Sequence, residues 1–97
     1  MKTLENTDIS GASKNVPDIQ TFGNGDAFKL ICKAWSKKEG WMKSTKAMEI
    51  PDLGCVVQVT TQQTNPDGSF AIGEAVTFVS GAVIGTDKDG NPALSIR

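Results

Sequence analysis

Ninety-seven residues provide for one domain with a modest core and leave no room for a second. Ten lysines and arginines nearly balance eleven aspartates and glutamates, so the net charge of −1 gives no overall field that would draw the chain to nucleic acid or membrane. Histidine, the commonest general base and metal ligand, is absent, and an apolar content of 38% predicts a small core that shares some apolar surface with a partner.

Residues 1–26 predict an extended polar arm that precedes a single β-domain over residues 27–97. The arm is rich in Ser, Asn, Asp, Thr and Gly, its apolar residues follow no helical or strand period, and Pro17 and Gly23-Asn24-Gly25 interrupt it. It offers too little apolar surface to offset its ordering entropy, so we expect it to be ordered only against its own domain or a neighbouring subunit. Its candidate anchors on a protein partner are the apolar residues Leu4, Ile9, Val16, Ile19 and Phe22.

The beginning of the chain lacks the apolar run of a signal peptide, and no stretch approaches the ~18 apolar residues of a transmembrane helix. We therefore expect a protein that is not secreted by a signal peptide, does not enter a membrane and lies in the cytoplasm.

Residues 27–50 predict two strands, Ala27–Ser36 and Trp41–Ile50, joined by the loop Lys37–Gly40. A helix over Lys37–Met48 is the alternative, because several of its residues are tolerable helix formers. The first strand is expected to turn Phe28, Leu30, Cys32 and Ala34 to one face. If Ser36 faces Trp41, then Trp35, Lys33 and Ile31 lie opposite Met42, Ser44 and Lys46, but a slip of one residue would reverse the faces.

The strongest local signal is a long hairpin over Cys55–Val79 around the turn Asn65-Pro66-Asp67-Gly68. Proline at the second position and glycine at the fourth predict a type I turn followed by a bulge. Both strands alternate with period two, and the second predicts an inward row of Phe70, Ile72, Val76 and Phe78. Glu74 interrupts this row, and a bulge at Gly73 that turns it outward is a simpler explanation than a buried functional carboxylate.

Two short strands, Ala82–Gly85 and Ala93–Arg97, complete the predicted domain. Six strands joined by local turns predict an all-β antiparallel meander that forms a small sandwich or a partly open barrel. The turn between the last two strands, Asp87–Asn91, begins like a calcium loop but lacks the remaining ligands and the bidentate glutamate, so we interpret it as a hairpin turn. No metal or cofactor is expected.

Cys32 and Cys55 both fall on predicted inward positions, which favours two buried reduced thiols over a disulfide between neighbouring strands. Without histidine, a nucleophile would need lysine or a carboxylate as its base, and no spacing provides one. We therefore expect no enzymatic activity.

Lysines and tryptophans gather in residues 29–46, where six of the ten basic residues lie with Glu39 as the sole acid. Such a ribbon is typical of a solvated hairpin face, of a protein-binding face, or of a surface that tracks phosphates and stacks bases of single-stranded nucleic acid. Its candidate partner-binding residues are Lys33, Trp35, Lys37, Lys38, Trp41 and Lys43.

Three stretches of the chain carry a resemblance to a known group of proteins: Glu39–Glu49, Gly54–Gln63 and Glu74–Val79. By these stretches the sequence resembles small proteins of tailed bacteriophages that have no assigned activity. The resemblance covers residues 27–85 and implies a phage context, in the virion or in the cytoplasm of the infected cell. It transfers no functional residues.

Three functions follow as hypotheses. The first is a non-enzymatic phage structural or accessory protein, a homo-oligomer that decorates or stabilises the capsid and reaches a neighbour with its arm. The second is a small inhibitor that binds a host protein through the two tryptophans. The third is a single-stranded nucleic-acid-binding protein.

Overall fold

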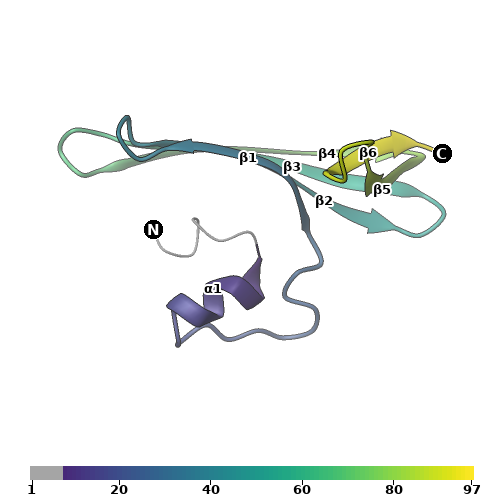
Figure 1. Cartoon of the computed structure of the whole chain (residues 1–97), viewed down its shortest axis with the longest axis horizontal. Helices are drawn as coiled ribbons and strands as arrows, with labels where there is room; N and C mark the ends of the chain where they lie inside the picture. Colours follow the sequence, from purple (N-terminus) through teal and green to yellow (C-terminus); the bar gives the residue numbers. More distant parts are fainter. Residues whose placement is uncertain (1–7) are drawn as a thin grey trace.

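The computed structural model describes residues 8–97, which form six strands and one short helix (Figure 1). Four strands make an antiparallel meander sheet in the order β1-β2-β3-β4, and the last two make a separate hairpin. The elements are α1 Ile9–Asn15, β1 Lys29–Ser36, β2 Trp41–Ile50, β3 Gly54–Thr64, β4 Phe70–Ser80, β5 Ala82–Thr86 and β6 Pro92–Ile96. The all-β prediction and its six strands are confirmed, and the helix considered over Lys37–Met48 is wrong.

The central β3–β4 hairpin closes through the predicted turn. Asn65 N donates to Ser69 O at 2.7 Å, Gly68 N donates to Asn65 O at 2.9 Å, and Gly68 has φ +87°. These bonds define a type I turn whose glycine forms the bulge, as the sequence predicts. The β5–β6 hairpin repeats the pattern between Asp87 and Asn91.

Strand register puts alternate residues of the sheet on two faces, which differ in what covers them. One face carries Ala47 and Cys55, and the β5–β6 hairpin folds back onto it, so that Ala82 completes a core of small buried side chains. Cys55 Sγ donates to Ala82 O at 3.3 Å, and Ile84 N donates to a Glu49 carboxylate oxygen at 2.8 Å. These bonds hold the hairpin over β1, β2 and β3 at one end of the sheet.

The other face buries three residues in its middle strands: Met42, Ser44 and Gln62. In Figure 1, α1 lies on this side of the sheet, away from the β5–β6 hairpin. The strands of residues 8–97 form no closed barrel, and the hairpin covers only one end of one face. The fold is therefore a long open sheet with a small cap.

Two local predictions need correction. The arm over residues 1–26 is not wholly extended, because Ile9–Asn15 forms α1. Asp8 caps this helix by accepting from Gly11 N, and Ile9 N donates to Asp26 Oδ1 at 2.7 Å. The cap and the proline that follows the helix, Pro17, were readable signals of a helix start and stop.

The second correction concerns β1. Trp35 pairs with Met42 and Lys33 with Ser44, as expected, but a bulge between Leu30 and Cys32 shifts the register, so Ile31 does not face Lys46. Ile31 is the extra residue of the bulge and packs against the small core, whereas Cys32 is exposed. The prediction that both cysteines are buried is therefore wrong for Cys32.

Candidate protein-binding surface

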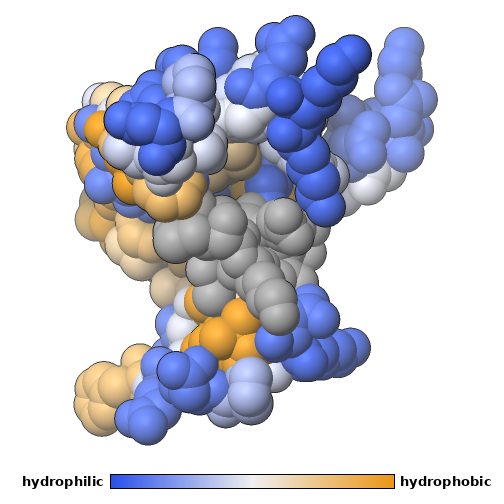
Figure 2. Space-filling model, turned by 90° about the vertical axis from the view of Figure 1, so that its left-hand side faces the viewer, coloured by the Kyte–Doolittle hydropathy of each residue, from blue (hydrophilic) through white to orange (hydrophobic). Residues whose placement is uncertain are grey.

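One of the two edge strands of the sheet, β4, carries a row of apolar side chains that the rest of the chain leaves uncovered. Every residue of β4 except the half-buried Val79 is exposed. The side chains predicted to point inward retain 50–63% of their exposure: Phe70, Ile72, Val76 and Phe78. We call these four residues the β4 row. Figure 2 shows apolar surface gathered along one side of the sheet layer and hydrophilic surface along its top and its other side.

Glu74 lies in the middle of the β4 row and points back toward β3. Its carboxylate accepts from Gln58 Nε2 at 2.6 Å and from Thr60 Oγ1 at 3.3 Å. The register runs without a shift from Gly54 to Thr64, so the predicted bulge at Gly73 is absent from this pairing. The one charge of β4 is therefore engaged with its own sheet.

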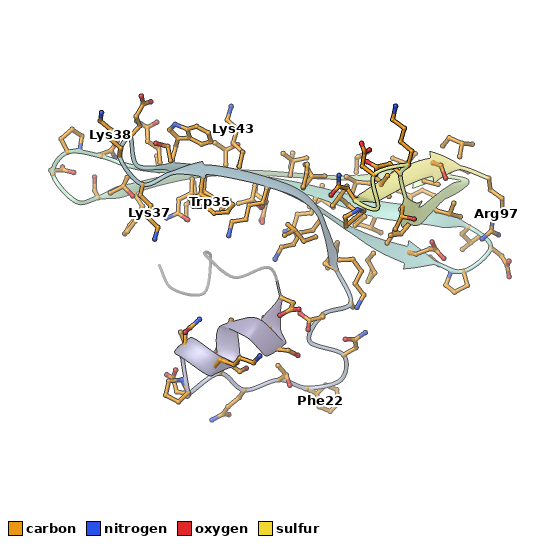
Figure 3. The ribbon with its side chains drawn as sticks, in the orientation of Figure 1. Phe22, Trp35, Lys37, Lys38, Lys43 and Arg97 are labelled. Atoms are coloured by element: carbon orange, nitrogen blue, oxygen red, sulfur yellow. The ribbon has the colours of Figure 1, made fainter. Side chains whose placement is uncertain are left out.

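The basic and aromatic residues of the β1–β2 ribbon are divided between the two faces of the sheet. Trp35 and Lys37 project toward the side of α1, whereas Lys38 and Lys43 project to the opposite side (Figure 3). Strand alternation places Trp41 with Lys43 and Lys33 with Trp35. The structure does not bring the predicted residues onto one basic, aromatic surface.

Trp35 is the more exposed of the two tryptophans, at 53%. Lys33 Nζ lies 5.3 Å from the centre of its ring, within the range of a cation–π interaction. This contact orients the indole on the face that also carries the β4 row.

The predicted anchors of the arm occupy different environments. Ile9, Val16 and Ile19 are half-buried, and Phe22 is fully exposed at the far side of the arm (Figure 3). Leu4 lies outside the described residues. Of the anchors that are described, Phe22 is the one available in full to a partner.

A groove of about 690 Å³ lies between the arm, β1 and the β5–β6 hairpin. Its lining carries two carboxylates, Asp8 and Asp26, and two lysines, Lys29 and Lys33, so no single charge dominates it. Both carboxylates are hydrogen-bonded within the arm, where Asp8 caps α1 and Asp26 accepts from Ile9 N.

The two cysteines are free thiols with different surroundings. Burial raises the pKa of the Cys55 thiol, and the nearby Glu49 carboxylate raises this pKa further, so the thiol is neutral at neutral pH. Residues 8–97 hold no cluster of three or more metal-ligating side chains. In the same range, no helix is long and apolar enough to cross a membrane.

No curated protein and no solved structure matches the chain. Residues 1–94 match the model of the Lockin family, and the chain therefore belongs to the Lockin family.

Proposed function

We propose that this protein is a non-enzymatic structural or accessory component of a bacteriophage particle, where it decorates or stabilises the capsid through protein–protein contacts. The observation that carries the proposal is the β4 row, four large apolar side chains that stay exposed along one edge strand of the sheet. Contiguous exposed apolar surface of this kind is typical of protein interaction sites. The phage context comes from the resemblance over residues 27–85.

Covering the β4 row would contribute to binding without any site chemistry. Full burial of a Val, Ile or Phe side chain is worth about 1.5–3 kcal/mol, so completing the burial of these half-exposed side chains contributes on the order of 1 kcal/mol each. Association costs about 4–15 kcal/mol in lost rigid-body freedom. The row therefore requires further contacts, and the exposed Phe22 of the arm is the natural supplement.

The test is attachment to purified particles of the phage that encodes the protein, prepared without it. We expect the wild-type chain to co-sediment with these particles to a saturable level, and a chain lacking residues 1–22 to lose attachment while it remains folded. Phe22→Ala should weaken attachment at least severalfold, with Pro17→Ala as a control elsewhere in the arm. Attachment that is unaffected by removal of the arm would contradict the role of the arm, and no attachment of the wild type would contradict the capsid proposal.

A second candidate is a small inhibitor that binds a host protein through the face of Trp35. It is favoured by the exposure of this indole and by the lysine that orients it, because oriented tryptophans are common at binding hot spots. Because the two tryptophans lie on opposite faces, Trp35→Ala should lose host-protein binding and Trp41→Ala should retain it. Equal effects of both substitutions would indicate general destabilisation and argue against this candidate.

A further inference from the structure

The two edges of the sheet are built differently. β1 carries lysines and a bulge between Leu30 and Cys32, both of which discourage pairing with another strand. β4 has eleven residues with no proline, lysine, arginine or register shift. Its only charge, Glu74, is bonded to β3, so β4 lacks the usual protection of an exposed edge.

The outward backbone groups of β4 belong to the residues of the β4 row. Asn65 N donates to Ser69 O, so this pair is hydrogen-bonded, and the odd residues of β4 therefore direct their N–H and C=O groups toward β3. The even-numbered residues of β4 direct their N–H and C=O groups to the open edge. These residues are Phe70, Ile72, Glu74, Val76, Phe78 and Ser80. A strand added at this edge would extend both the backbone ladder and the apolar row.

Antiparallel pairing of two β4 strands extends both the backbone hydrogen-bond ladder and the apolar row. A two-fold axis perpendicular to the sheet keeps the same face of both copies on one side, and it pairs even residues with even residues. An axis at Glu74 would oppose two carboxylates, which is destabilising. An axis at Ala75 overlaps all of Phe70–Ser80, and it places Ile72 opposite Phe78 and Glu74 opposite Val76 of the second copy.

We infer that the occupant of the β4 edge is a second copy of this chain, paired antiparallel about a two-fold axis at Ala75 to form a continuous eight-stranded sheet. This inference rests on the proposed function as a contact-forming protein and names its first partner. The β5–β6 hairpin packs over β1, β2 and β3, and so leaves the β4 edge accessible. The two β4 rows then form one apolar strip on the side of the sheet that faces α1.

The first experiment measures the mass of the full chain by light scattering and sedimentation equilibrium. We expect twice the 10.3 kDa mass of one chain. Val76→Glu puts a carboxylate directly opposite Glu74 of the second copy, twice in the symmetric pair, and should weaken dimerisation at least tenfold. Thr77→Glu puts the same charge on the opposite face of β4, where it meets Gly73 of the second copy, and should remain a dimer. A monomeric wild type, or a closed trimer or larger ring, would overturn the inference.

The second experiment tests the register. Ala75 residues of the two copies would form a non-hydrogen-bonded pair with Cα atoms about 4.5 Å apart, within disulfide reach. In a Cys32→Ser background, which removes the exposed thiol, Ala75→Cys should cross-link the dimer on mild oxidation. Ala71→Cys should not, since two copies of residue 71 lie near opposite ends of the paired strands. Cross-linking of Ala71→Cys at an equal rate would overturn the register.

Each variant is checked for folding by circular dichroism before its mass is interpreted, and Val76→Pro provides a second disruption. Val76 directs its N–H outward, so proline there removes no bond to β3 but blocks the added strand. A folded Val76→Pro chain that stays a dimer would contradict pairing through this edge. The outcome is separable from the capsid proposal, because a monomer that attaches to particles refutes only the dimer and a dimer that ignores particles refutes only the attachment.

Discussion

Asp67 and Asp89 occupy the same third position in two turns of the same type, yet only one carboxylate is bonded into its turn. Asp67 Oδ1 accepts from Ser69 Oγ at 2.6 Å and from Ser69 N at 2.9 Å. The Ser69 hydroxyl, followed by the Ser69 amide, lowers the pKa of Asp67 below its ordinary value of 3.8. In the other turn, the carboxylate of the first residue, Asp87, is the acceptor instead, and its donors are the backbone amides Asp89 N and Asn91 N.

This difference predicts how the central hairpin responds to acid. A carboxyl with a lowered folded-state pKa contributes stability that is present above its unfolded pKa and is lost as the pH falls through the folded value. We expect Asp67→Asn to flatten the fall of Tm below pH 4, and Asp89→Asn to change that fall less. The measurement is a series of thermal melts from pH 6 to pH 2. A pH profile of Asp67→Asn that matches the wild type would contradict the assigned bonds.

At the scale of elements, Gly54 decides how closely β3 passes the chain that leaves β4. A Cβ atom built at Gly54 would lie 2.3 Å from Val79 O and 3.0 Å from Gly81 N, both of which are backbone atoms that cannot move aside. Gly85, in β5, has open space around the same position. The close approach at Gly54 is what lets β5 turn back over the sheet immediately after Gly81.

We therefore expect Gly54→Ala to destabilise the fold by about 2–3 kcal/mol, because the added methyl overpacks a fixed backbone. For a domain of this size the loss lowers Tm by roughly 10–20 °C. Gly85→Ala, the matched control, should change stability by less than about 1 kcal/mol. Denaturant melts of both variants decide the question, and equal effects at the two glycines would show that the approach at Gly54 is not limiting.

The sequence predicted the elements whose signals are local, and it failed where the outcome depends on distant packing. The loop at Lys37–Gly40 gave β2, and alternation with turn chemistry gave the β3–β4 hairpin with its turn at Asn65–Gly68, because these signals are set within a few residues. The bulge beside Ile31 follows from its packing against the small core, which no local pattern contains. The same holds for the β4 row, whose alternation was right but whose face remains uncovered within its own chain.

At the scale of the whole molecule, the chain exposes more surface than a compact monomer of its mass. Its accessible surface is 6891 Å², whereas a folded monomer of 10.3 kDa is expected to expose about 5,400 Å². Its radius of gyration is 14.8 Å against an expected ~12.5 Å. Among residues 8–97, the buried apolar residues are few and mostly small: Ala12, Met42, Ala47, Cys55 and Ala82. A molecule of this shape would gain stability from an association that covers part of this surface.

If the two copies pair through β4, unfolding and dissociation are coupled and Tm depends on protein concentration. Tenfold dilution changes the free energy of dissociation by about 1.4 kcal/mol, and the unfolding entropy of two such chains is about 0.4 kcal/mol/K, so we expect Tm to fall by about 3 °C for each tenfold dilution. Val76→Glu should melt at a lower temperature that does not change with concentration, because it opposes two carboxylates across the pair, while Thr77→Glu should follow the wild type. Scanning calorimetry over a hundredfold range of concentration measures the effect. A wild-type Tm that is independent of concentration over that range would mean that the sheet is stable as a monomer and would contradict pairing through β4.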